Sequence, residues 1–311
     1  MNPKSLRARL GIGTKLRKLR YALLPRADVP NLPTVSFQSY DEHEAYLWRD
    51  SVEIVARLAE ESRLVPARTG QSIRGFCYVC RGMRSFAVSI SAATGRPNWR
   101  ETLTCETCGL WTRVRAALQV IETDLHLGPN STVYITEQCT PLFGHLKSKY
   151  RNLIGSEFLG DDVSPGSLNA NGVRHEDLTN LSFGDESFDY ILSFDVFEHV
   201  PEFRTAFEEC FRCLKPGGVL AFSVPFVASS RSIIVRATVD VDGRIHHLLP
   251  PETHGDPVRF EGSLCFYHYG WQLLDMLRSI GYIDVRALSC WSRELCVIGG
   301  GEQLMFVAGK P

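Results

Sequence analysis

Short apolar runs alternate with amphipathic segments through the second half of the chain. Apolar runs of four to six residues are typical of strands that are covered on both faces. We expect strands at 131–136, 152–156, 191–194, 219–224, 284–288 and 303–307. After Pro201, the positions Phe203, Phe207, Cys210 and Leu214 recur every three or four residues, which forms one apolar helical stripe. Helices are also expected from Thr112 and over 271–280. Alternating strands and helices indicate an α/β fold with a parallel sheet.

The N-terminal part has a different pattern. Residues 1–26 predict a basic helix, which is either a surface anchor for a membrane or an acidic partner, or a solvated tail. Pro25, Pro30 and Pro33 then favour a linker. Residues 41–63 predict one docking helix without chemistry of its own. Its apolar stripe is expected to pack on the rest of the protein and consists of Leu47, Val52, Val55, Leu58 and Ala59.

Four cysteines have the spacing of a metal site. Cys77 and Cys80 form one CxxC pair, and Cys105 and Cys108 form a second pair after 24 intervening residues. Two such pairs complete a tetrahedral set of thiolates, so the sequence predicts a zinc ribbon with a closed, structural zinc site. The alternative is four unliganded thiols. The other cysteines are expected in the core: Cys139, Cys210, Cys213, Cys265, Cys290 and Cys296.

The amino-acid composition and the distribution of charge exclude some classes of protein. The 44% hydrophobic and 22% charged residues are ordinary for a globular protein, and no apolar run approaches the ~20 residues that span a bilayer. Residues 1–26 carry eight basic groups and no acidic one, so the remainder holds 26 basic and 35 acidic residues. A nucleic-acid partner is therefore unlikely for the catalytic part. With no export signal in view, a cytoplasmic location is expected.

Two linked motifs resemble a known enzyme family. LSFGDESFDYILSFDVFEHV at 181–200 and CLKPGGVLAFSVP at 213–225 are similar to the second half of class I S-adenosylmethionine (SAM)-dependent methyltransferases of the type 11 kind. The resemblance implies a Rossmann-like, doubly wound sheet of seven strands with an antiparallel final pair. Three regions follow: a basic segment with the docking helix (1–70), the zinc-ribbon-like segment (71–112) and the methyltransferase domain (113–311).

Acidic residues follow the expected strands where a doubly wound sheet binds its nucleotide. Glu157 comes twenty residues after Glu137, the offset at which a carboxylate accepts hydrogen bonds from ribose hydroxyls. The resemblance assigns cofactor contacts to Glu137, Gln138, Glu157, Asp177, Leu178, Ser193 and Asp195, with Asp177 and Leu178 at the adenine. The loop after Glu137 contains no glycine, although the family usually has a glycine-rich loop there. Either a wider loop still binds SAM, or the site is weakened.

Candidates for a general base lie downstream. Glu198 and His199 directly follow the fourth strand; they are either a proton-transfer pair or the entry of a helix. A further alternative, from relatives of this fold, is a divalent ion held by Asp195, Glu198 and His199. His254 and His268 belong to an insertion, about 226–269, that is expected to cover the acceptor. Asp242-Gly243 in that insertion predicts a hairpin turn.

The leading hypothesis is a SAM-dependent methyltransferase with SAM and structural zinc as cofactors and a small-molecule or saccharide acceptor. The alternatives are an RNA methyltransferase and a catalytically silent binding module of the same fold. The glycine-free loop motivates the silent module, whereas the acidic charge of the catalytic part disfavours RNA.

Overall fold

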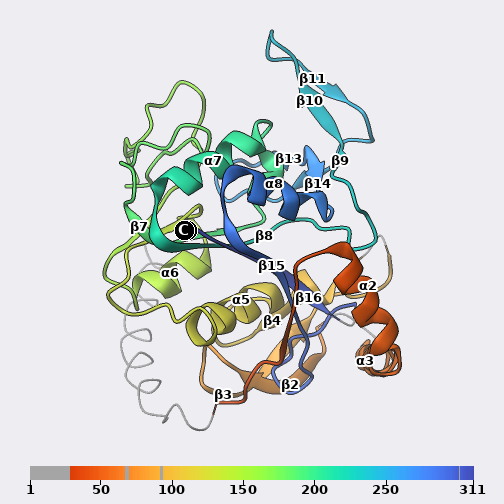
Figure 1. Ribbon diagram of the computed structural model, residues 1–311. Helices are drawn as coiled ribbons and strands as arrows, with labels where there is room; N and C mark the ends of the chain where they lie inside the picture. Colours follow the sequence, from red (N-terminus) through yellow and green to blue (C-terminus); the bar gives the residue numbers. More distant parts are fainter. Residues whose placement is uncertain (1–28, 67–69, 92–93, 301) are drawn as a thin grey trace, which may run out of the picture.

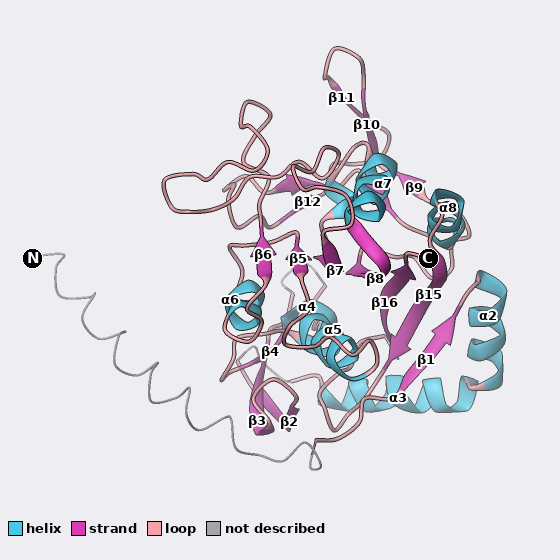
Figure 2. Cartoon of the chain, turned by 60° about the vertical axis from the view of Figure 1, so that its left-hand side comes forward, coloured by secondary structure: helices cyan, strands magenta, loops and turns pink. Residues whose placement is uncertain are grey.

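A seven-stranded sheet forms the centre of the protein (Figures 1 and 2). The computed structural model describes residues 29–66, 70–91, 94–300 and 302–311. From one edge to the other the strands are β6 (Leu153–Gly155), β5 (Val133–Ile135), β7 (Phe188–Phe194), β8 (Leu214–Ser223), β16 (Gln303–Gly309), β15 (Ile283–Cys290) and β1 (Thr34–Phe37). Neighbours are parallel from β6 to β8 and antiparallel from β8 to β1. The six predicted strands and the antiparallel final pair are confirmed.

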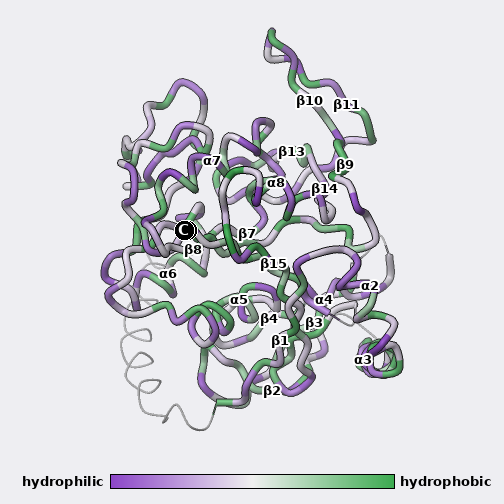
Figure 3. Tube along the Cα trace, in the orientation of Figure 1, coloured by the Kyte–Doolittle hydropathy of each residue, from purple (hydrophilic) through white to green (hydrophobic). Residues whose placement is uncertain are grey.

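Helices cover both faces of the sheet. α5 (Thr112–Thr123) and α6 (Pro141–Lys147) share one hydrophobic cluster, and α7 (Phe203–Cys213) and α8 (Gln272–Ile280) share another. Side chains of β5 alternate between the two, because Tyr134 belongs to the α7–α8 cluster and its two neighbours belong to the α5–α6 cluster. Figure 3 shows the apolar segments concentrated in the sheet and in α5. The doubly wound α/β fold is therefore confirmed.

The seventh strand comes from an unexpected part of the chain. The sequence pattern favoured a linker around Pro33, yet Thr34–Phe37 forms β1 and pairs antiparallel with β15. These four residues include β-branched and aromatic side chains, which favour a strand, but the prolines before them favoured a linker. Pro33 is compatible with this strand because a proline is tolerated directly before or at a strand start. Residues 175–178 form no strand and contribute two isolated bridges, a parallel one between Glu157 and His175 and an antiparallel one between Asp177 and Asn180.

The single docking helix expected over 41–63 is two helices, α2 (Tyr40–Arg49) and α3 (Ser51–Leu64). The break at Asp50 rotates the apolar stripe out of line, so Val52 and Val55 are 84% and 64% exposed. Leu47 packs on the cluster shared by α7 and α8, as expected, whereas Val52, Val55 and Leu58 are exposed, so the expectation holds for only part of the stripe. α3 is held instead by Glu61, which accepts hydrogen bonds from Trp291 Nε1 at 2.8 Å and from the backbone N–H groups of 299 and 300 at 2.8 and 2.9 Å.

A three-stranded antiparallel sheet carries the CxxC pairs. It consists of β2 (Ser72–Cys77), β3 (Gly82–Val88) and β4 (Leu103–Cys105), with the short helix α4 (Trp99–Thr102) before β4. The unit packs against the loop that precedes β16. The N–H of Phe76 donates to Glu294 O at 2.7 Å, and the fully buried Arg115 of α5 donates to the carbonyls of Leu295 and Cys296, each at 3.0 Å.

Cys210 and Cys213 are buried in the core, as expected, and so are Cys265, Cys290 and Cys296. Cys139 was expected to be buried, but it is exposed, because it lies in the loop between β5 and α6.

The insertion after β8 is made of short strands. They are β9 (Ile234–Val235), β10 (Ala237–Val239), β11 (Ile245–His247), β12 (Thr253–His254), β13 (Ser263–Leu264) and β14 (Tyr267–His268). The hairpin predicted at Asp242-Gly243 is confirmed between β10 and β11, and it projects away from the sheet (Figure 1). Among the described residues, no helix has the length and apolarity needed to cross a membrane. The basic segment 1–26 lies outside the described residues.

Candidate SAM and metal sites

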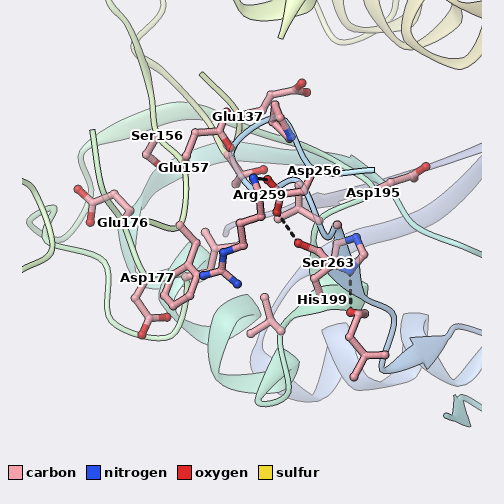
Figure 4. Close-up of a pocket in the computed structure, with 18 of the residues that line it drawn as sticks. Glu137, Ser156, Glu157, Glu176, Asp177, Asp195, His199, Asp256, Arg259 and Ser263 are labelled. Atoms are coloured by element: carbon pink, nitrogen blue, oxygen red, sulfur yellow. Dashed lines mark hydrogen bonds between the residues drawn. The ribbon is translucent and has the colours of Figure 1, made fainter. Parts of the chain in front are cut away.

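A cavity of about 990 Å³ lies at the carboxyl ends of β5, β6 and β7. The strand ends supply one wall, and residues 255–264 of the insertion supply another (Figure 4). Five of the seven predicted cofactor residues line it: Glu137, Glu157, Asp177, Leu178 and Asp195. This is the location at which parallel sheets of this kind bind ligands. Its size would accommodate a nucleoside-containing ligand with space beside it.

The two remaining residues of that set lie outside the cavity lining. Gln138 uses its side chain to tie the loop after β5 to a neighbouring segment, donating to Gly172 O at 2.9 Å and accepting from the N–H of Arg174 at 2.8 Å. Ser193 is fully buried in the sheet, and its hydroxyl accepts a hydrogen bond from Thr136 Oγ1 at 2.9 Å. Both side chains therefore support the strand ends in this structure.

Glu157 organises the glycine-free loop. Its Oε1 accepts hydrogen bonds from the backbone N–H groups of Gln138 and Cys139 at 2.7 and 2.6 Å. The loop thus directs two amides at the end of β6, and the next helix, α6, is capped by the hydroxyl of Thr140, which accepts from the N–H of Phe143 at 3.2 Å. Burial raises the pKa of Glu157, although these amides oppose the shift.

Glu137 is a buried carboxyl group of the cavity wall with a strongly raised pKa. Its side chain is almost completely buried, and burial raises its pKa to about 7. The neighbouring carboxylates Glu157 and Asp195 act in the same direction, whereas the charge of Arg113 acts against it. Near neutral pH the group therefore exchanges between its acid and its carboxylate, and a cationic ligand in the cavity would favour the carboxylate.

This raised pKa predicts a pH dependence of stability. An acid whose pKa is higher in the folded than in the unfolded protein keeps its proton longer when folded, so stability falls as pH rises from about 4.5 to 7. Between pH 5 and 7.5 the loss should be about 2 kcal/mol. Urea unfolding of the wild type and of Glu137→Gln will measure it: because Gln resembles the protonated carboxyl group, the stability of Glu137→Gln relative to the wild type should rise by about 2 kcal/mol across this range if Glu137 is the cause. A constant difference would contradict the assignment.

Asp177 lies on the opposite side of the cavity from His199 (Figure 4), and Leu178 also lines the cavity. Asp177 Oδ1 accepts hydrogen bonds from the N–H and the hydroxyl of Thr179, both at 2.8 Å, which holds the turn after residue 177. The segment is fixed from behind by His175, whose Nδ1 accepts from the N–H of Leu159 at 2.9 Å. A carboxylate and an apolar side chain thus face the cavity from one rigid turn.

Asp195 is engaged by two arginines that the sequence analysis did not connect with it. Arg100 of α4 donates to both of its oxygens, each at 2.9 Å, and Arg113 Nε lies 3.1 Å from Oδ2. The hydroxyl of Ser223 donates to Oδ1 at 2.7 Å. Burial alone would raise the pKa of Asp195, but the charges of Arg113 and Arg100 hold it well below its usual range. Asp195 therefore joins the cysteine-bearing unit to the end of β7.

The four candidate general bases occupy different places. His199 lines the cavity, Glu198 is fully buried behind it, and both belong to the 3₁₀ turn η3 (Phe197–His199). His254 of β12 lies 3.4 Å from Glu198, measured from Nδ1 to Oε1. His268 is farther back and contacts Glu252 through Nε2 at 3.1 Å. The structure brings all four into one chain of contacts, of which only His199 reaches the cavity wall.

The insertion adds residues to the cavity that no sequence signal had singled out. Arg259 extends into the cavity (Figure 4), and its guanidinium lies 5.1 Å from the ring centroid of Phe158. Asp256 accepts from the N–H of Arg259 at 2.9 Å and from the hydroxyl of Ser263, which shapes the turn. The sequence places Asp256 in the insertion, but its contact with Ser263 could be found only from the folded chain.

The four CxxC thiols converge in the described structure. The sulfur atoms of Cys77, Cys80, Cys105 and Cys108 lie within 4.8 Å of one another. Cys77 and Cys108 are 3.9 Å apart, as are Cys80 and Cys105. Sulfurs around a tetrahedral zinc ion with bonds of about 2.3 Å are separated by about 3.8 Å, whereas a disulfide requires about 2.05 Å. The predicted convergence is confirmed.

Comparison with known proteins shows that one segment of the chain matches a protein family. Residues 144–222 match the family model described as a methyltransferase domain. A probable S-adenosylmethionine-dependent methyltransferase of Mycolicibacterium smegmatis is 34% identical over 79 residues, which cover 24% of this chain and 30% of that protein. The matched segment thus spans less than a third of the curated relative.

Solved structures show similar, more distant likenesses. A SAM-dependent methyltransferase of Mesorhizobium loti is 15% identical, with 60% of this chain and 95% of that chain covered and a TM-score of 0.36. A SAM-dependent methyltransferase of Thermotoga maritima, described as a possible histamine N-methyltransferase, is 18% identical, with 64% and 90% covered and a TM-score of 0.37. The family match contains β6, β7, α7 and most of β8, and with them Glu157, Asp177 and Asp195. Residues 144–222 therefore match a methyltransferase domain, and these three acidic residues of the segment line the cavity.

Proposed function

We propose that the protein binds SAM in the cavity and transfers its methyl group to a small molecule. The observation that carries the proposal is the group of acidic residues Glu137, Glu157 and Asp177, which line one cavity at the ends of β5 and β6, within and beside the segment that matches the methyltransferase family. Glu157 would accept from the ribose hydroxyls, and Asp177 from the adenine amino group. Glu137, which is poised near neutral pH, would face the cationic amino-acid half.

The residues present fit this cofactor. Carboxylates are pure acceptors when ionised, and ribose hydroxyls and an amino group are donors. When bound, SAM supplies a methyl group that is already activated on a sulfonium sulfur. The protein then has to exclude water and align the acceptor, which is the role we assign to the turn at 255–264 and to His199.

A small or saccharide acceptor fits the cavity better than RNA does. The lining contains two cationic side chains, Arg113 and Arg259, and Arg113 is already paired with Asp195 and Glu101. The acidic strand ends outnumber them. Sequence-independent contacts with an RNA backbone need a basic surface. A hydroxyl-bearing acceptor would instead lie beside the ring of His199, which lines the cavity.

A silent binding module is the second candidate, and the loop after β5 favours it. This loop has no glycine, and its amides at Gln138 and Cys139 already bind the carboxylate of Glu157. SAM could bind by sharing Glu157, or the site could hold the cofactor without turnover. Calorimetry with SAM, followed by methyl-transfer assays on acceptor panels, separates binding from catalysis. If neither SAM nor S-adenosylhomocysteine binds at millimolar concentration, both proposals fail.

Substitution of Glu157 tests the ribose contact. Glu157→Ala should weaken SAM binding on the order of 10- to 100-fold, since hydrogen bonds to a charged group contribute about 1.5–3 kcal/mol. Glu157→Gln retains an acceptor for the two loop amides but loses the charge, so it should also weaken binding. Glu208→Ala is the matched control, because Glu208 is an exposed residue of α7 that pairs with Arg204. Wild-type affinity in Glu157→Gln would reduce Glu157 to a residue that only holds the loop.

We also propose that the four CxxC thiols hold a structural zinc ion. Their mutual distances suit a tetrahedral site, and four protein ligands leave no open position for chemistry. The ion would fix β2, β3 and β4 against each other, and these strands position Arg100 and Arg113 at Asp195.

A further inference from the structure

A second cluster of potential ligands lies directly behind the cavity wall. Glu198, His199 and His254 each offer one atom to a common point, and these atoms lie within 4.8 Å of one another. Two of the three residues come from η3, after β7, and the third comes from β12 in the insertion. The cluster shares no residue with the CxxC site. It therefore needs an explanation of its own.

The main evidence for a ligand at this cluster is the buried carboxylate of Glu198. Its side chain is completely inaccessible to solvent, yet neither carboxylate oxygen forms a hydrogen bond with any residue in the described part of the chain. The nearest groups are His254 Nδ1 at 3.4 Å and His199 Nε2 at 3.7 Å from Oε1. A buried carboxylate without partners is strongly unfavourable, so a positive charge at this position would remove a large cost.

The two imidazoles are oriented to present lone pairs to Glu198. His199 Nδ1 lies 2.8 Å from the carbonyl oxygen of Leu264, which can only accept, so this nitrogen carries the proton. His254 Nε2 lies 3.0 Å from Glu252 Oε1, which likewise accepts. In the neutral rings, the opposite nitrogens are therefore unprotonated, and both face the carboxylate. Two lone pairs and an anion converge without a cation between them.

We propose that Glu198, His199 and His254 bind a divalent transition-metal ion. Two histidines and one carboxylate with positions left open are a ligand set for Fe²⁺, Mn²⁺, Co²⁺ or Zn²⁺. Ligand atoms at about 2.0–2.2 Å from an ion are separated by about 3–3.5 Å, close to the two distances observed at Glu198. Asp195 takes no part, because Arg100 and Arg113 engage it.

Outer contacts have the arrangement that metal-binding histidines need. Glu252 fixes the orientation of His254 and is itself held by His268 Nε2 at 3.1 Å and Arg236 Nη2 at 3.1 Å. His199 belongs to the cavity wall, so an open position of the ion would face the cavity. If the proposed methyl transfer holds, an acceptor hydroxyl bound there would lose its proton more easily. The metal site itself does not depend on that activity.

The competing occupant is a proton. His254 lies between two carboxylates, and the contact with Glu198 raises the pKa of His254 to about 9. An imidazolium would satisfy Glu198 without any metal. Direct metal binding decides between the two.

The test is a titration of the full-length, zinc-loaded protein with Mn²⁺, followed by electron paramagnetic resonance. Mn²⁺ prefers oxygen and nitrogen ligands, so the thiolate site does not compete for it. We expect one bound ion per chain, loss of binding in Glu198→Gln and His254→Gln, and about 10- to 100-fold weaker binding in Glu252→Gln. His246→Gln, in the exposed hairpin where His246 pairs with Asp240, should bind as the wild type does.

Two results would overturn the proposal. One is the absence of a second site for both Mn²⁺ and Co²⁺ in the zinc-loaded wild type, which leaves the proton as the occupant. The other is undiminished binding in His254→Gln when circular dichroism shows that this variant is folded. Because neither readout involves SAM, failure here leaves the proposed methyltransferase function unaffected.

Discussion

Cys105→Ser is expected to lower the midpoint of thermal unfolding by about 10 °C and to release the proposed zinc ion. Cys105 ends β4 and is completely buried between the two CxxC pairs. A serine cannot replace the thiolate, so the remaining three ligands hold the ion weakly and the folding energy coupled to metal binding is lost. A loss of about 4–5 kcal/mol corresponds to this shift for a chain of this size, at roughly 2 °C per kcal/mol.

Calorimetric melting together with metal analysis will measure both effects. Cys139→Ser is the matched control, because Cys139 is an exposed thiol outside the cluster, and this variant should keep one zinc per chain and the wild-type midpoint. A chelator added to the wild type should reproduce the shift of Cys105→Ser. If the wild type contains no zinc and the two serine variants melt alike, the cluster is four thiols without a metal.

Asp195→Asn should lower the free energy of unfolding by about 3–5 kcal/mol at pH 7. The substitution removes one of the two carboxylates that Arg100 and Arg113 share, so Glu101 alone is left to balance two guanidinium groups that are largely buried. Asn is the informative replacement. Asp195 has a φ of 56°, in the left-handed region that Asn also tolerates, so the backbone preference is kept and the charge alone is removed.

The stability of Asp195→Asn should be measured at pH 7, because the pKa of Asp195 is lowered in the folded protein. The pKa of Asp195 is depressed in the folded protein, so its contribution is complete above the unfolded pKa of about 4 and is lost as pH falls below it. Urea unfolding at pH 7 therefore captures the whole effect. Asp185→Asn, whose carboxylate is 74% exposed beside Arg212, should cost less than about 1 kcal/mol. An equal cost for both variants would show that the Asp195 cluster adds no more than a surface ion pair.

The strand ends were predictable because they depend on local order along the chain. Glu137 and Glu157 each follow an apolar run, and parallel strands bring their carboxyl ends to one edge, whereas Asp177 was assigned by the family resemblance. The CxxC cluster was predictable for a similar reason, since the spacing alone implies two knuckles that meet. In both cases a pattern within a short stretch of sequence is sufficient to predict which residues come together.

The rest depended on contacts between distant segments. Arg100 of α4 and Asp195 after β7 are 95 positions apart, and nothing in either local sequence indicates the pair. The proposed ligand set of Glu198, His199 and His254 also could not be predicted from local sequence, because the fold of the insertion brings His254 to Glu198. The break at Asp50 was missed because the apolar residues on its two sides keep helical spacing, although they face in different directions.

The origin of the last strand of the sheet has a consequence for biosynthesis. β1 pairs through Thr34 with Cys290 near the other end of the chain, so this edge cannot close until almost the entire polypeptide has left the ribosome. Until then the nascent N-terminal strand has no partner, and β15, once formed, exposes a row of unpaired amides and carbonyls to other chains. Shortening the protein from its N-terminus beyond Phe37 would make that exposure permanent, so such fragments should form dimers or aggregates through β15.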